Sequence, residues 1–186
     1  NFIRNLHNLN PVTYDYQSDI FTAKAALIIA ASKQMSHFPD SSLPCWTQEG
    51  YFGSSKSNLY WWGWYDTIPK TEDFIKGWVI DDEVESLGHR KWLLNPFLEQ
   101  ISFGRVDIPN FTGAAIRVIY DSTAFSNVDF VAYPYEEYPR NLFLFDWYFS
   151  FTAIPEKHDI WANERVDFSR ATIEVTDEAG NSISVH

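Results

Sequence analysis

Two histidines in polar breaks of the sequence are the residues best suited to chemistry in this chain. His37 lies in the segment MSHFPD, after an alanine-rich run, and His89 lies in the segment GHRKWLLNP. Acidic residues, among them Asp81, closely precede the second histidine. Imidazoles from two separate segments with carboxylates nearby are typical of a divalent-metal site or of acid–base catalysis. Two structural, hydrogen-bonded histidines would leave the same pattern, so both interpretations stay open.

The short motifs of several hydrolase classes are missing from the sequence. It contains neither the G-x-S-x-G of a serine nucleophile elbow nor the H-E-x-x-H of a zinc peptidase. Cys45 is the single cysteine, so no internal disulfide can form, and its use as a nucleophile would need a partner histidine that the sequence does not locate. Arg90, which follows His89, is more typical of a clamp on a helix C-terminus than of a partner for a cleft carboxylate.

The composition indicates one acidic, aromatic-rich domain, or one domain with a small appendage. The 186 residues include 14 basic and 25 acidic side chains, which give a net charge of −11. This charge argues against binding to nucleic acids and to anionic lipid headgroups. Aromatic residues make up 18% of the chain, enough for a core with rings left over for a binding face. Without a run of about 18 apolar residues, we expect no membrane span.

Helical periodicity dominates the first half of the chain. It predicts helices over residues 2–9, 19–35 and 71–81, with weaker helical character over 49–57. The alanine-rich second helix is apolar nearly all round, so it should be buried against a sheet and another helix.

The run 58–66 is too aromatic and too interrupted by glycine to assign. Because neighbouring side chains of an extended segment point to opposite sides, at least one of Trp61 and Trp62 should lie near the surface. These rings would form a stacking platform for sugars, an apolar slot for a lipid, or a cover over the core. The rings concerned are Tyr60, Trp61, Trp62, Trp64 and Tyr65.

After Pro96 the apolar period changes from helical spacing to alternation. Residues 100–106 and 114–120 should be adjacent antiparallel strands of a sheet, joined by a hairpin loop over 107–113, and 127–133 is a candidate third strand.

The C-terminal part of the chain alternates as well. From residue 146 the pattern indicates a small β unit that ends in a hairpin turning at 178–181. We expect Trp147, Phe149 and Phe151 to pack this unit on one face, and the unit to depend on the main domain for stability.

Three segments and their order carry a family resemblance: SHFPD, SNL, and GHRKWLLNP followed by ISFGRV. Together they resemble the CAP superfamily (cysteine-rich secretory proteins, antigen 5 and pathogenesis-related 1 proteins), in particular its bacterial extracellular branch without disulfides. The resemblance implies an α+β fold, with a CAP-type α-β-α sandwich over residues 1–133 and a β-rich extension over 134–186. It also implies an extracellular or cell-surface location. The chain starts at Asn1 without an initiator methionine or a signal-peptide pattern, so we expect a trimmed or mature fragment whose targeting information is missing.

The same resemblance implies a cleft that holds two histidines and two acids. His37 and His89 match the histidines, Asp81 matches one glutamate, and Ser57 stands where the other glutamate would be. Some relatives bind a divalent cation through the histidines. No cofactor is certain here, and zinc or another divalent cation on His37 and His89 is a candidate that the missing acid should weaken. The implied cleft residues are His37, Ser57, Asn58, Asp81 and His89.

The leading functional hypothesis is a secreted or surface-exposed domain that binds a cell-envelope glycan or an apolar, lipid-like ligand in this cleft. Catalysis is not expected, because Asp81 is shorter than glutamate and Ser57 is no acid. One alternative is a metal-dependent peptidase or wall-active hydrolase with Asp81 as the base. Another is an interaction or spacer module of a larger surface protein, which a flat hydrophobic patch on the extension would favour. The oligomeric state does not follow from the sequence.

Overall fold

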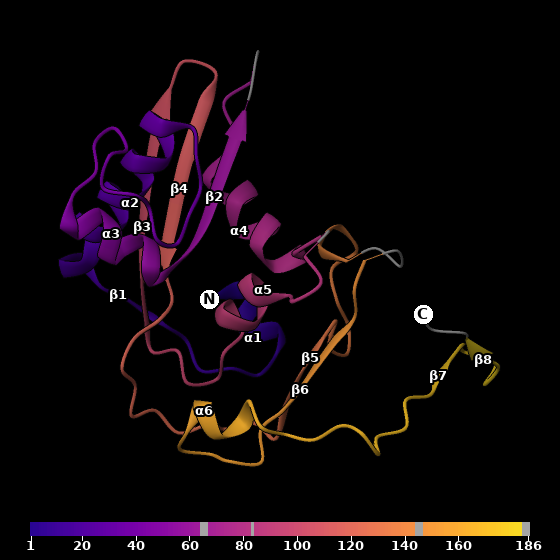
Figure 1. Cartoon of the computed structure of the whole chain (residues 1–186). Helices are drawn as coiled ribbons and strands as arrows, with labels where there is room; N and C mark the ends of the chain where they lie inside the picture. The colour runs from indigo at the N-terminus through magenta and orange to yellow at the C-terminus, as the bar shows by residue number, and fades with distance from the viewer. Residues whose placement is uncertain (64–66, 83, 144–146, 184–186) are drawn as a thin grey trace.

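The protein combines helices and sheets, as the predicted α+β class requires (Figure 1). A computed structural model of the chain describes residues 1–63, 67–82, 84–143 and 147–183. The helices are α1 (Phe2–Leu6), α2 (Asp19–Ser32), α3 (Gln48–Ser55), α4 (Thr71–Ile80), α5 (Gly88–Leu93) and α6 (Ile160–Asn163), with short 3₁₀ turns at Tyr16–Ser18 and Arg140–Leu142. The strands are β1 (Thr13–Tyr14), β2 (Ser57–Gly63), β3 (Gln100–Ile108), β4 (Phe111–Arg117), β5 (Phe130–Tyr133), β6 (Ser150–Ala153), β7 (Val175–Thr176) and β8 (Ser182–Ile183).

Four strands form the central sheet in the order β1-β3-β4-β2, with β1 parallel to β3 and the other pairs antiparallel. The predicted pairing of 100–106 with 114–120 is confirmed by β3 and β4. The observed loop is far shorter than the predicted one over 107–113, because the strands pair as far as Ile108 and Phe111 and leave a two-residue turn. Asn110 occupies that turn with a φ of 62°, a conformation that asparagine tolerates.

The aromatic run that the sequence left unassigned is the edge strand β2 and the chain after it. Alternation along β2 points Leu59 and Trp61 to one face of the sheet, and Asn58 and Tyr60 to the other. The side chains of Trp61 and Trp62 are 51% and 39% exposed, which confirms that at least one ring lies near the surface. Trp64 and Tyr65 lie outside the described residues.

One face of the sheet is covered by α2, with α3 packed against it. The predicted burial of this alanine-rich helix against a sheet and a second helix is confirmed. Its close approach depends on Gly104, where a Cβ would lie 2.2 Å from the backbone carbon of Thr22. The helix ends at Ser32 and not at residue 35, because Lys33 turns into the left-handed region.

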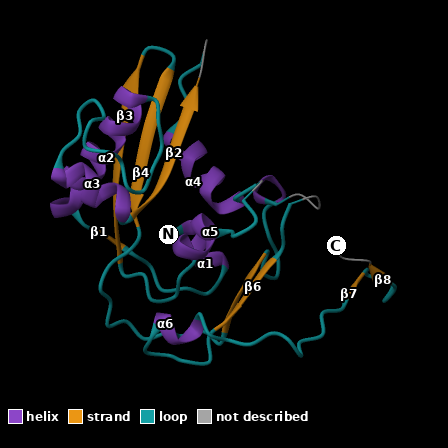
Figure 2. Ribbon diagram, viewed as in Figure 1, coloured by secondary structure: helices purple, strands orange, loops and turns teal. Residues whose placement is uncertain are grey.

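Helices α4 and α5 lie on the other face, so helices flank both sides of the sheet (Figure 2). Phe74 and Trp78 of α4 are fully buried there, against Ala114 and Ile116 of β4. The Trp78 indole Nε1 donates a hydrogen bond of 2.9 Å to the carbonyl oxygen of Leu59 in β2. This bond ties α4 to the outermost strand of the sheet.

The candidate third strand exists as β5, but it pairs with β6 in a separate two-stranded sheet. Its hydrogen bonds cross the boundary predicted near residue 134, which stays a prediction. Beyond β6 the chain contains the short helix α6 and a hairpin of two-residue strands, so it is less regular than the alternation suggested (Figure 1).

The prediction that Trp147, Phe149 and Phe151 pack the extension on one face was wrong. Val131 and Tyr133 of β5 are buried toward the main body, whereas Phe151 projects from the opposite face of the same ladder. Phe149 and Phe151 are therefore exposed, and they do not form a core with Trp147. Among the described residues, no helix is long and apolar enough to cross a bilayer.

Candidate ligand-binding cleft

The centre of the site is a hydrogen-bonded pair formed by Asp81 and His89. Asp81 directly follows α4 and adopts a left-handed conformation with a φ of 53°, which turns the chain toward α5. His89 lies in the first turn of α5, and its Nδ1 is 2.7 Å from Asp81 Oδ1. Because a carboxylate oxygen accepts hydrogen bonds, His89 Nδ1–H is the donor to Asp81 Oδ1.

Asp81 is enclosed and fully engaged. Its side chain is 1% exposed, and its second oxygen, Oδ2, accepts a hydrogen bond of 3.1 Å from the backbone N–H of Arg90. A buried carboxylate needs such partners, since an unpaired charge would be costly to bury. Asp81 therefore orients the imidazole, with both of its oxygens engaged inside the protein. The other ring nitrogen of His89, Nε2, makes no hydrogen bond within the described part of the chain.

Asn58 joins this pair, and Ser57 does not. The Asn58 side-chain Nδ2 donates a hydrogen bond of 2.9 Å to the carbonyl oxygen of His89. Ser57 precedes Asn58 in β2, so its side chain points to the opposite face, where its register partner Arg117 also lies. Within the described residues, the buried Ser57 Oγ has no hydrogen-bond partner. Strand alternation thus separates two of the five residues expected to share a cleft.

His37 lies in the exposed loop after α2. Its Nδ1–H donates a hydrogen bond of 3.0 Å to the carbonyl oxygen of Ser54, in the last turn of α3. The described residues show no contact between the rings of His37 and His89. Their opposition across a cleft stays a prediction.

The cation site expected on His37 and His89 stays a prediction. No three His, Cys, Asp or Glu side chains converge within residues 1–63, 67–82, 84–143 and 147–183. Structural zinc sites use four protein ligands, and catalytic zinc sites use three. His89 Nε2 alone has the support typical of a metal ligand, because Asp81 holds the other ring nitrogen.

A cavity of about 430 Å³ opens beside the Asp81–His89 pair. Because its walls include side chains from both faces of β2, it lies along the open edge of the sheet. Aromatic and aliphatic side chains form most of its surface. The lining residues are Met35, Leu59, Tyr60, Trp61, Gly77, Trp78, Ile80, Asp81, Asp82, Val84, His89 and Trp147.

Sequence reasoning missed Met35 and Trp147 as members of this cavity. Met35 comes from the loop after α2, and Trp147 comes from the extension. Neither follows a motif or a spacing that points to the cleft, because tertiary contacts alone bring them there.

Arg90 connects the pair to its surroundings and is the predicted helix clamp. Burial lowers the pKa of its guanidinium, whose central carbon lies over the Tyr133 ring at 3.9 Å from the ring centroid. Its Nε donates to the carbonyl oxygen of Val79 at 2.7 Å, and one terminal nitrogen donates to that of Ile80. These two carbonyls belong to the end of α4, so Arg90 fixes the point from which Asp81 departs.

Comparison with known proteins adds no family. The chain matches no protein-family model, and no curated protein matches it significantly.

Proposed function

We propose that this protein is a CAP-like domain, secreted or surface-exposed, that binds a glycan of the cell envelope in the cleft beside His89. The observation that carries the proposal is the Asp81–His89 pair, joined at 2.7 Å in the wall of an aromatic cavity of about 430 Å³. The helices on both faces of the central sheet, followed by an extension, support the CAP-type sandwich implied by the sequence segments.

A sugar ring suits both kinds of surface in this cleft. Its apolar face can stack on the indole and phenol rings, while its hydroxyl groups need hydrogen-bond partners. His89 Nε2, held by Asp81 in the accepting tautomer, is such a partner. A purely apolar ligand would bury Nε2 without a hydrogen-bond donor, which would reduce the binding free energy by about 1–3 kcal/mol. The volume lies in the range of about 300–1,000 Å³ typical of small-molecule sites.

The hydrolase alternative receives less support. In that alternative Asp81 is the base, yet both of its oxygens are hydrogen-bonded inside the protein. A general base must lie within hydrogen-bond reach of the substrate proton. We therefore propose that the cleft binds without turnover, and that any cation binds weakly through His89.

The test is titration calorimetry with soluble peptidoglycan oligosaccharides, and with palmitate as an apolar probe. We expect saturable binding of the oligosaccharide, weakened about twofold to tenfold by His89→Ala through loss of one hydrogen bond. His158→Ala is the matched control, because His158 is exposed on the extension and does not line this cavity. Binding of palmitate alone would replace the glycan with an apolar ligand. Binding of neither probe would contradict both.

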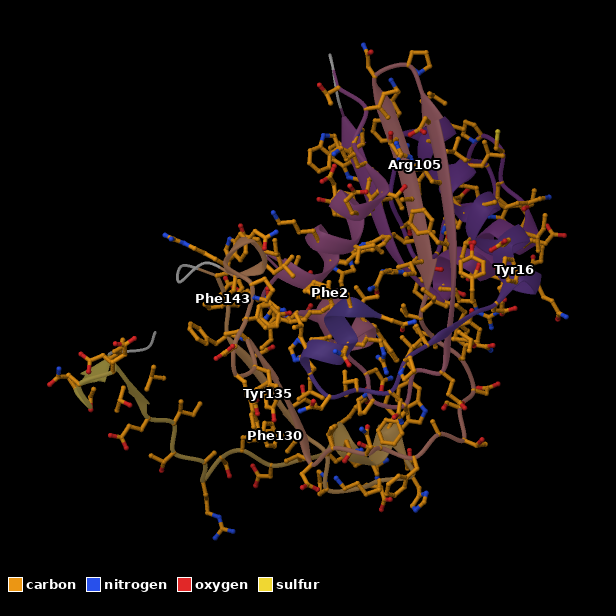
Figure 3. All side chains as sticks on the ribbon, turned by 180° about the vertical axis from the view of Figure 1, so that it is seen from behind. Phe2, Tyr16, Arg105, Phe130, Tyr135 and Phe143 are labelled. Carbon is orange, nitrogen blue, oxygen red and sulfur yellow. The ribbon has the colours of Figure 1, made fainter. Side chains whose placement is uncertain are left out.

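A second candidate function, an interaction module, is favoured by one observation. Phe130 and Phe151 stack at 5.2 Å on the outer face of the β5–β6 sheet and are both exposed. Tyr135 adjoins Phe130 on the same arm of the molecule, as Figure 3 shows. If this aromatic face is the functional surface, Phe151→Ser would abolish attachment to cell-envelope preparations while His89→Ala would leave it unchanged.

A further inference from the structure

The extension reaches into the cleft of the main body. Trp147, from the segment just before β6, lines the same cavity as Asp81 and His89. Figure 1 shows the β5–β6 arm rising toward the end of α4, where this cavity lies. Trp147 is thus far from the pair in the sequence but belongs to the same site.

The same stretch of chain that forms the pair also holds this segment in place. Arg90 directly follows His89, and its backbone N–H binds Asp81 Oδ2. One terminal nitrogen of its guanidinium donates to the carbonyl oxygen of Tyr148 at 2.8 Å and to Ser150 Oγ at 3.2 Å. The neighbours of Trp147 are therefore fixed to the residue beside the imidazole.

The β5–β6 ladder supplies a second, independent constraint. Tyr133 of β5 is paired with Ser150 of β6, and the Tyr133 ring is buried under the Arg90 guanidinium. The Tyr133 hydroxyl donates a hydrogen bond to the carbonyl oxygen of Leu142. Because this register sets where β6 begins, it also sets the position of Trp147 three residues earlier.

We propose that the extension supplies one wall of the cleft, with Trp147 as the ring that determines which ligands fit and Arg90 as the residue that positions it. The role in ligand choice rests on the proposed glycan function, whereas the wall itself does not. The extension is then part of the binding site. Loss of Trp147 opens the cleft and exposes His89 Nε2.

The wall can be tested without any ligand, by the rate at which diethyl pyrocarbonate acylates each histidine of the folded full-length chain. Peptide mass spectrometry reads His37, His89 and His158 in one sample. We expect Trp147→Ala to raise the rate at His89 several-fold and to leave the other two rates unchanged. Phe149→Ala is the matched control, because Phe149 lies two residues away, is exposed, and does not line the cavity.

Ligand choice is tested by titrating the same variants with the peptidoglycan oligosaccharide. We expect Trp147→Ala to weaken binding about twofold to tenfold, the effect of losing one stacked ring. Trp147→Phe should recover part of this loss, because it restores an aromatic face. Near-ultraviolet circular dichroism checks that each variant is folded, and Ser150→Ala replaces Trp147→Ala if the latter is not.

The two readouts separate the two proposals. A faster reaction at His89 in Trp147→Ala supports the wall, even if wild-type protein binds no oligosaccharide, and in that case the glycan function fails alone. An unchanged rate at His89 in a folded Trp147→Ala variant would overturn the wall. Equal weakening of oligosaccharide binding by Phe149→Ala would overturn the specific role of Trp147.

Discussion

The main body and the extension are both rich in aromatic residues, but they place them differently. In the main body, Phe74 and Trp78 are buried between α4 and the central sheet. In the extension, Phe149, Phe151 and Phe168 are each about half exposed. Composition alone therefore does not determine a core, because burial requires a second layer for the rings to pack against.

The difference shows what holds the extension in place. Arg90 binds the start of β6, and Lys157 Nζ binds the carbonyl oxygen of Val128 and, at 2.7 Å, the carboxylate of Asp129. Besides these polar contacts, Tyr138 and Phe143 of the extension pack against the hydrophobic cluster that contains Phe74 and Trp78. The main body thus holds the extension in place, and both hydrophobic clusters of the described residues are centred on the main body.

Separating the two regions should have the largest effect. A peptide of residues 146–186 should show no cooperative thermal transition, because it lacks β5 and a buried apolar layer. Circular dichroism and amide proton dispersion measure this. A dispersed spectrum with a sharp unfolding transition would show that the extension folds by itself, contrary to the comparison.

Truncating one ring in each region should sharpen the contrast. Phe74 is 0% exposed and Phe151 is 56% exposed. Phe74→Ala should therefore lower the free energy of unfolding by about 3–5 kcal/mol, the usual cost of a large buried cavity. Phe151→Ala should change it by less than about 1 kcal/mol. Urea denaturation of the two full-length variants provides the measurement, and similar losses would remove the distinction.

A pH effect is expected at the junction between the regions. His7 of the main body is buried beside Tyr133 and Tyr138, and its Nε2 is 3.1 Å from the Tyr138 hydroxyl. Burial, reinforced by the nearby charges of Arg90 and Arg4, lowers the pKa of His7 to about 4.

The unfolded chain then binds a proton at His7 below about pH 6.5, while the folded chain stays neutral there down to about pH 4. Stability should fall as the pH decreases through this window, by about 2–3 kcal/mol. His7→Gln, compared with wild type by urea denaturation at pH 7 and pH 4.5, should lose this component. Equal pH slopes in the two proteins would mean that His7 is not the group responsible.

Local periodicity was enough to predict part of the fold. The helical spacing of α2 and α4 and the alternation of β3 and β4 identified these elements, because each buries one regular set of side chains. The strand β2 escaped prediction, since its aromatic side chains face both sides of an edge strand and leave no alternation to see.

The site was predictable only in part. Its histidine and carboxylate stood out as residue types, but their pairing depends on the left-handed turn at Asp81. The side chains of adjacent residues in a strand point to opposite faces of the sheet. Recognising β2 from the sequence would therefore have placed Ser57 and Asn58 on different faces. Trp147 depends on a contact between distant segments, which a single sequence does not encode locally.

The hydrogen bond from Trp78 to Leu59 has a consequence for how this chain behaves at high concentration. An outer strand with unpaired backbone groups invites a strand from another molecule to add to the sheet, which begins aggregation. The indole occupies one such carbonyl on β2 and places a bulky helix side chain beside it. A strand from another molecule would therefore find this one position of the edge already occupied.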